Sequence, residues 1–185
     1  FVAYNRFDKK RVEMKSIIFF TNAFVIIFTL NIYPLRADFT AKVQRVVDGD
    51  TVHVVNKAGK KFKVRLTGID APEKNQPYGL AATYKLTEIL INKLVLLKSK
   101  PNNGKPYTID RYKRVLAKII LDGKDINLSQ VLTGYAWHFK RYQKQQSPSD
   151  RELYSEAEID AKKNELGLWE EKNPIAPWKW RKMKK

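Results

Sequence analysis

The chain has 185 residues, enough for one domain with a hydrophobic core and a short additional segment. Its formal net charge of +17 predicts a polyanionic partner, either nucleic acid or an anionic membrane surface. The absence of cysteine excludes disulfides, cysteine-ligated zinc and thiol catalysis. His53 and His138 do not stand at a metal-binding spacing, and we expect both to be ordinary strand or helix residues.

The first 37 residues have the character of a targeting segment. Residues 1–13 are polar and basic, and we predict that they are an upstream extension of the reading frame, with the natural start at Met14. An apolar run follows from residue 17 to residue 32, and Leu35-Arg36-Ala37 then places a small residue at a plausible cleavage position.

These features predict a secretory signal peptide over residues 14–37. The alternative is an uncleaved membrane anchor through residues 14–32, because this apolar run approaches the length of a membrane span. In either case we expect the domain of residues 38–185 to be exported, that is, secreted or periplasmic. This domain keeps a net charge of +13 and is therefore basic in its own right.

From Asp38 onward the sequence predicts short strands separated by turn residues. The expected strands are residues 40–47, 51–55, 61–69, 94–98 and 115–121. Asp48-Gly49-Asp50 predicts a turn, and residues 56–59 a hairpin. We expect the third strand to end where Pro72 interrupts the pairing, and residues 99–108 to form an exposed loop.

Three helices are expected. The first runs through about residues 79–92, with apolar residues at helical spacing at Leu80, Leu86, Ile89 and Leu90. The second begins at Asn127 with Gln130 as its capping-box partner and ends at Gly134. The third runs from Pro148 to Gly167, and we expect the later Trp178 and Trp180 to pack back on the domain.

Three strands, a helix and two more strands are the order of an OB-type barrel. The predicted fold class is therefore α+β, mainly β: a five-stranded OB-fold barrel with three packing α-helices. Such barrels bind oligonucleotides on an open face, which agrees with the basic charge of the domain.

The stretch from Val64 to Glu73 begins as an alternating strand and ends in an acidic turn. A guanidinium at Arg65 is followed by hard-oxygen ligands at Asp70 and Glu73, a combination typical of a site where a cation and a phosphate meet. The alternative is a strand with one solvated arginine and an acidic turn.

Two further segments could complete this site. Asp50 continues from the Asp-Gly turn into a strand, where an acidic residue is disfavoured without a partner. Beside Asp70 it would form a two-carboxylate pocket for a divalent cation, and calcium tolerates such a site better than magnesium. Arg114 begins the fifth strand with Tyr112 two residues earlier on the same face; it is either a second phosphate-binding guanidinium or part of an ordinary basic junction.

Taken in order, these motifs resemble the thermonuclease (staphylococcal nuclease) family. The resemblance is carried by Asp48-Gly49-Asp50-Thr51, Arg65-Leu66-x-Gly68-Ile69-Asp70-x-Pro72-Glu73 and Asp110-x-Tyr112-x-Arg114-x-Leu116-Ala117. Gly134-Tyr135-Ala136-Trp137, Tyr142 and Gly167-Leu168-Trp169 are similar to the secreted bacterial members. The resemblance covers about residue 38 to the end of the chain.

The resemblance implies an OB barrel that hydrolyses DNA and RNA with Ca²⁺ and leaves 3′-phosphate ends. It assigns roles to nine residues: Asp50, Asp70 and the Ala71 backbone carbonyl as calcium ligands; Glu73 on the attacking water; Arg65 and Arg114 on the phosphate; Tyr112, Lys113 and Tyr142 at the nucleotide. Members often have Thr at the position of Ala71, a change that a main-chain ligand should tolerate.

The preferred interpretation is therefore a calcium-dependent nuclease of DNA and RNA that acts on single-stranded or frayed substrate, as a monomer without an obligate protein partner. The main alternative is an OB-type module that binds nucleic acid without cutting it. A membrane-held polyanion binder, anchored through residues 14–32, explains none of the carboxylates.

Overall fold

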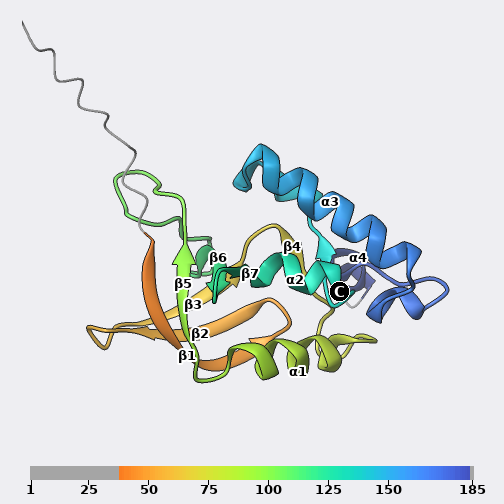
Figure 1. The fold of residues 1–185 in the computed structure, drawn as a ribbon, viewed down its shortest axis with the longest axis horizontal. Helices are drawn as coiled ribbons and strands as arrows, with labels where there is room; N and C mark the ends of the chain where they lie inside the picture. The colour runs from red at the N-terminus through yellow and green to blue at the C-terminus, as the bar shows by residue number, and fades with distance from the viewer. Residues whose placement is uncertain (1–37, 184–185) are drawn as a thin grey trace, which may run out of the picture. The chain divides into compact units, whose positions relative to one another are not determined.

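The computed structural model describes residues 38–183 (Figure 1). The predicted upstream extension, residues 1–13, and the predicted signal peptide or anchor, residues 14–37, lie outside the described residues. Within the described range, no helix combines the length and the apolar character needed to cross a membrane.

Five strands form a barrel: β1 (Phe39–Asp48), β2 (Thr51–Asn56), β3 (Lys61–Leu66), β5 (Leu94–Lys98) and β6 (Val115–Leu121). They follow the order β3-β2-β1-β5-β6, with antiparallel neighbours, and a parallel pairing of β3 with β6 closes the ring. A short β7 (Lys124–Asp125) adds to β6. Closure removes the exposed sheet edges, and the topology confirms the predicted OB-type α+β fold.

The barrel core consists of the inward residues of the alternating strands, such as Val43, Val54 and Leu66, which are fully buried. Helix α1 (Gly79–Leu90) contacts β1 and buries Ala82, Leu86 and Leu90. Leu80, one of the apolar residues at helical spacing, is 56% exposed and lies outside this buried face. The helix presents the small Ala82 to the strands instead.

The third strand is shorter than predicted. Strand β3 ends at Leu66, and Gly68 takes a left-handed backbone with φ of 78°, a conformation that glycine adopts without steric cost. The chain then enters a separate two-stranded sheet, in which β4 (Ile69–Asp70) pairs with β8 (Trp137–His138). The predicted single strand over residues 61–69, ended by Pro72, was therefore wrong.

The remaining helices follow the barrel in the chain: α2 (Ile126–Leu132), α3 (Pro148–Lys163) and α4 (Pro177–Met183), with 3₁₀ segments η1 (Lys140–Gln145) and η2 (Gly167–Glu170). Helix α2 contacts both β6 and α3 (Figure 1). Helix α3 begins at a Ser147 cap as the Pro-Ser-Asp run predicts, but it ends at Lys163, four residues before Gly167. Helix α4 was not predicted.

The capping box expected for α2 was also wrong. Asp125 caps this helix, accepting a hydrogen bond from the Leu128 backbone nitrogen at 3.1 Å. Asn127 and Gln130 are fully buried and hold chain segments together instead. The Gln130 amide donates to the Gly49 carbonyl at 3.1 Å. Gly134 follows the helix with φ of 70°, so its predicted role at the helix end is confirmed.

Asn127 ties the end of the third strand to β6. Its amide nitrogen donates to the carbonyls of Thr67 (3.0 Å) and Ala117 (3.2 Å), and its amide oxygen accepts from the Ile119 backbone nitrogen at 3.1 Å. The fold therefore uses a buried side chain to satisfy backbone groups where β3 leaves the barrel.

Replacing Asn127 with alanine should cost about 2–4 kcal/mol of unfolding free energy, because three backbone groups each lose a hydrogen bond, although the Ala117 carbonyl keeps another, from the Thr67 backbone nitrogen. Urea unfolding followed by circular dichroism measures this loss. Asn102→Ala, in an exposed loop, is the control and should leave the midpoint in place. Equal midpoints for both variants would contradict the structural role of Asn127.

Candidate active site

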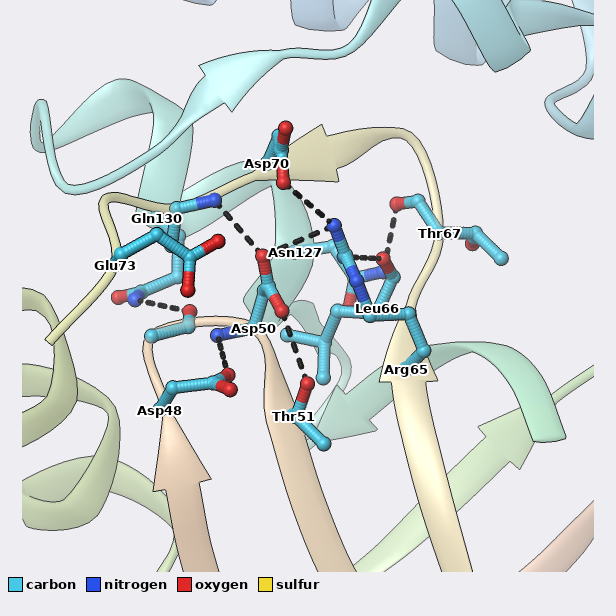
Figure 2. A network of polar contacts seen from close by, with 12 residues as sticks. Asp48, Asp50, Thr51, Arg65, Leu66, Thr67, Asp70, Glu73, Asn127 and Gln130 are labelled. Atoms are coloured by element: carbon cyan, nitrogen blue, oxygen red, sulfur yellow. Dashed lines mark hydrogen bonds and ion pairs between the residues drawn. The ribbon is translucent and has the colours of Figure 1, made fainter. Parts of the chain in front are cut away.

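Charged side chains from distant parts of the sequence converge at one rim of the barrel (Figure 2). Asp50 lies in the turn between β1 and β2, Arg65 lies in β3, and Asp70 ends β4. Glu73 follows in the next loop, and in Figure 2 its carboxylate points toward Asp50. The structure therefore brings together four of the residues that the sequence predicts for the site.

Arg65 lies between the two aspartates. Its Nη2 atom is 3.0 Å from Asp50 Oδ2 and 3.0 Å from Asp70 Oδ1, and its Nη1 atom donates to the Leu66 carbonyl at 2.6 Å. The two carboxylates thus face one another across a single cationic nitrogen. Both are buried, so their attraction to positive charge is screened less than at the surface.

Asp50 is held by hydrogen bonds to both of its carboxylate oxygens. Oδ2 accepts from the Ala71 backbone nitrogen at 2.8 Å, and Oδ1 accepts from the Thr51 hydroxyl at 3.0 Å. The first bond fixes the backbone of Ala71 beside Asp50, across 21 positions in the sequence. The segment predicted to supply a main-chain ligand is therefore next to the first predicted carboxylate ligand.

The rim carries an excess of buried negative charge. Burial raises the pKa of Asp70, an effect that the hydrogen bond from Arg181 opposes and the charge of Asp50 reinforces. Burial and the neighbouring Asp50 charge raise the pKa of Asp48 to about 6. A raised pKa means that the charged form of each carboxylate is disfavoured in the folded protein. An added cation would relieve this cost.

The backbone of Glu73 is fixed, but its carboxylate remains accessible, with a side chain 39% exposed. Its carbonyl accepts from the Gln76 backbone nitrogen at 2.8 Å. Gly79, at the start of α1, packs so closely on the same carbonyl that any Cβ atom there would overlap it. Helix α1 therefore sets the position of Glu73 relative to the aspartates.

Arg114 lies on the same side of the sheet as Arg65. The parallel register pairs Arg65 with Leu116, and Arg114 precedes Leu116 by two residues, so the alternation of side chains places both arginines on the outer face. Arg114 pairs with Asp110, with Nη2 and Nε at 2.7 Å and 2.8 Å from Oδ2. In the described residues it makes no ion pair with the aspartates at the rim.

The predicted nucleotide-contacting residues lie on the surface. Tyr112 is 62% exposed, with the Arg114 guanidinium 5.3 Å from its ring centre, and Lys113 is exposed with a left-handed backbone. Tyr142 lies in η1 and is about half exposed beside Phe139, the ring centres 5.1 Å apart. Tyr112 thus contacts a predicted phosphate-binding arginine, Arg114, whereas Tyr142 makes no such contact within the described residues.

A cavity of about 430 Å³ begins beside the outer-face residues Thr67 and Leu116. Its lining is rich in lysine and hydroxyl side chains: Lys98, Ser99, Lys100, Thr108, Lys118, Ser147 and Ser149. Lys118 is already paired with Asp150 at 2.6 Å and Asp125 at 3.1 Å. Lys98 and Lys100 have no ion-pair partner in the described part of the chain, and the carboxylate of Asp150 also lines the cavity.

Sequence reasoning missed two residues at this rim. Arg181, from α4, contacts Asp70 and Glu73, and only a general lysine and arginine cluster beside the tryptophans pointed to it. Asp110 was also missed as the partner of Arg114, because the two residues lie in a turn before β6, where the i,i+4 rule for helices gives no signal.

The donors for a metal ion are few but of suitable chemistry. Across residues 38–183, no group of three or more His, Asp or Glu side chains is arranged to hold one. Asp50 and Asp70 present carboxylates to a shared position, and Ala71 places a main-chain carbonyl in the same segment. Hard oxygens of this kind suit calcium or magnesium when water completes the coordination.

Comparison with known proteins identifies the family. The family model described as "Staphylococcal nuclease homologue" matches residues 63–171, from within β3 to just after the end of η2. The chain belongs to the staphylococcal nuclease family. Membership supports the hydrolysis of phosphodiester bonds in nucleic acids, and it confirms the resemblance seen in the motifs.

Relatives of this family match most of the chain. An uncharacterized endonuclease of Haemophilus influenzae is 37% identical over 161 residues, which cover 87% of this chain and 83% of the relative. A micrococcal nuclease of Shigella flexneri is 35% identical over 162 residues, covering 82% and 86%. An uncharacterized endonuclease of Escherichia coli is 31% identical over 161 residues, covering 86% and 96%.

The pKa of Asp48 yields a prediction about stability. Since this pKa, about 6, lies above the ordinary value of 3.8, the metal-free protein loses stability as pH rises through that window and stays less stable above it. Asp48→Asn should therefore gain on the order of 1–2 kcal/mol at pH 8 and almost nothing near pH 4.

Thermal unfolding of the metal-free variant at both pH values measures this difference. Asp160→Asn, an exposed carboxylate on α3, serves as the control for losing a negative charge on a basic protein. A gain at pH 8 that is equal in the two variants would contradict the burial argument for Asp48.

Proposed function

We propose that this protein is a calcium-dependent nuclease that hydrolyses DNA and RNA and leaves 3′-phosphate ends. The observation that carries the proposal is the pair of buried carboxylates, Asp50 and Asp70, facing each other with Glu73 and two arginines beside them. The names of the relatives, endonuclease and micrococcal nuclease, support the same reaction class.

Asp50, Asp70 and the Ala71 carbonyl would hold the calcium ion. When bound, the ion would act as a Lewis acid toward the phosphate and neutralise the negative charge of the rim. The buried pair suits this task because its hydrogen bonds fix Asp50, and because Asp70 lies in a paired strand. Arg65, whose Nη2 lies between the two carboxylates, would have to move aside for the ion.

The arginines would bind the phosphate. Attack on a phosphodiester increases the negative charge on its non-bridging oxygens, and fixed guanidinium groups aimed at those oxygens lower the barrier. Arg65 would exchange its carboxylate partners for the phosphate, and Arg114 would approach it from the same outer face. Tyr112, Lys113 and Tyr142 would contact the nucleotide, since exposed tyrosines can stack on unpaired bases.

Glu73 would position the attacking water and take its proton. Its carboxylate is accessible, lies next to the proposed metal site, and has a backbone fixed by α1. A carboxylate in hydrogen-bond reach of water is a suitable general base, which typically contributes ~10²–10⁴-fold to the rate.

Digestion of single-stranded DNA by the chain, with calcium and with an excess of chelator, tests the proposal. Calcium-dependent cutting that leaves 3′-phosphate ends is the expected result. Tight binding by a folded sample without any cutting would instead favour a non-catalytic OB-type binding module. Binding should weaken steeply with salt in both cases, because the domain is basic.

Replacing Glu73 with glutamine should lower kcat by ~10²-fold or more, since the amide cannot accept the proton of the attacking water. Steady-state kinetics on single-stranded DNA with saturating calcium measures the effect. Glu156→Gln, on the exposed face of α3, is the matched control and should retain wild-type kcat. Near-wild-type turnover of the Glu73 variant would remove this residue from the mechanism.

The remaining parts of the proposal concern the setting of the enzyme. We propose that it prefers single-stranded or frayed substrate, acts as a monomer without an obligate protein partner, and is exported by the segment before residue 38. Comparison of single- and double-stranded substrates, sedimentation velocity and N-terminal sequencing of the mature protein test these points in turn.

A further inference from the structure

The segment after η2 returns to the rim and is attached there by specific contacts. Gln76, in the loop after Glu73, donates its side-chain amide to the Ile175 carbonyl. Ala176 and Pro177, at the start of α4, are buried. The beginning of this helix is therefore fixed to the same loop that carries Glu73.

Aromatic contacts fix the rest of α4. The ring of Trp178 stacks on Phe139, with centres 5.2 Å apart and planes at 24°, and meets the ring of Trp137 edge-on at 5.5 Å. Trp180 donates its indole N–H to the Asn75 side chain at 3.2 Å. The predicted packing of both tryptophans against the domain is thus confirmed, and it directs the next residue, Arg181, toward the site.

The Arg181 guanidinium donates hydrogen bonds to the carboxylates of both Asp70 and Glu73. Its Nη2 is 2.7 Å from Asp70 Oδ2, and its Nη1 is 2.7 Å from Glu73 Oε1 and 3.3 Å from Asp70 Oδ1. The two bonds of 2.7 Å thus each go to one oxygen of a carboxylate, Oδ2 of Asp70 and Oε1 of Glu73. Asp70 Oδ1 is the oxygen that faces Asp50 across Arg65, and Glu73 Oε2 has no hydrogen bond or ion pair in the described residues.

We propose that Arg181 is a positioning residue of the active site, one that holds Asp70 and Glu73 so that their other oxygens face the cation and the attacking water. This inference rests on the proposed nuclease function and assigns that function a third guanidinium. A planar guanidinium can bridge two carboxylates at fixed angles, which the point charge of a lysine cannot do. Groups that orient metal ligands in this way tune both affinity and rate.

A purely structural role explains less of the geometry. The Arg181 side chain is 43% exposed, so solvent screens its ion pair with the partly exposed Glu73, although Asp70 is buried. The attachment of α4 is already provided by Trp178, Trp180 and the bond from Gln76. Arg181 can therefore be changed without undocking the helix, and its effect on the reaction can be measured separately.

The test compares Arg181→Ala and Arg181→Lys with Lys182→Ala, which removes one positive charge from an adjacent exposed position of the same helix. We expect Arg181→Ala to lower kcat by about 10²-fold, because misplacing catalytic groups by about 1 Å costs that much. KM should change little, Arg181→Lys should recover part of kcat, and Lys182→Ala should behave as wild type. All variants should remain folded, with unfolding midpoints above the assay temperature.

A second variant leaves Arg181 intact. Trp178→Ala removes the aromatic anchor of α4, so the guanidinium is no longer held over the carboxylates, and kcat should fall in the same way as in Arg181→Ala. Combining the two substitutions should add little further loss, since both disrupt one arrangement. Full additivity of the two losses would contradict the proposal.

Calcium titration of the metal-free proteins gives a readout that is independent of turnover. If Arg181 orients Asp70, its removal should weaken calcium binding, by up to about 10-fold. If Arg181 only competes with the ion, calcium affinity should rise and kcat should be retained, and this would overturn the proposal. If the wild type cuts DNA and Arg181→Ala is equally active, this inference alone is refuted. If the folded wild type cuts nothing, the proposed function is refuted.

Discussion

The structure depends on balancing buried negative charge at one rim of a small barrel. Asp50 and Asp70 are almost fully buried, and unpaired carboxylates in such a position would cost several kcal/mol each. Arg65 and Arg181, which lie far apart in the sequence, form ion pairs with these aspartates. The Ala71 backbone nitrogen and the Thr51 hydroxyl donate further hydrogen bonds to the Asp50 carboxylate. Such a site is suited to bind a cation, because the free energy needed to bring the buried carboxylates together is already spent when the protein folds.

The rim depends on residues that make long-range contacts, although the sequence had indicated that Asn127 and Gln130 only cap a helix. Gly68 turns the chain out of β3, which allows Asp70 to pair in a second sheet with Trp137. Asn127 and Gln130 then hold the ends of β1 and β3 through hydrogen bonds to Thr67 and Gly49. These two buried amides therefore hold the chain segments that carry Asp50 and Asp70.

The sequence was sufficient to predict the five barrel strands, apart from the end of the third, because alternation is a local signal; the grouping of Asp50 with Asp70, Glu73 and Arg65 came from their residue types and from the family resemblance. It was insufficient for Asn127, whose spacing imitates a helix cap, because burial depends on segments 60 residues away. Arg181 was equally hidden, since a basic residue beside tryptophans looks the same whether it faces solvent or a carboxylate pair. Long-range contacts, and not propensity, decide these cases.

The parallel pairing of β3 with β6 has a consequence for how the enzyme reaches activity. This pairing joins residues about fifty positions apart in the sequence, and contacts of that separation form slowly because a long loop must first close. Arg65 and Arg114 come to share one face only after this closure. A chain that has not yet closed this pairing therefore keeps Arg114 apart from Asp50, Arg65 and Asp70, so the predicted phosphate-binding arginines come together only in the completed barrel.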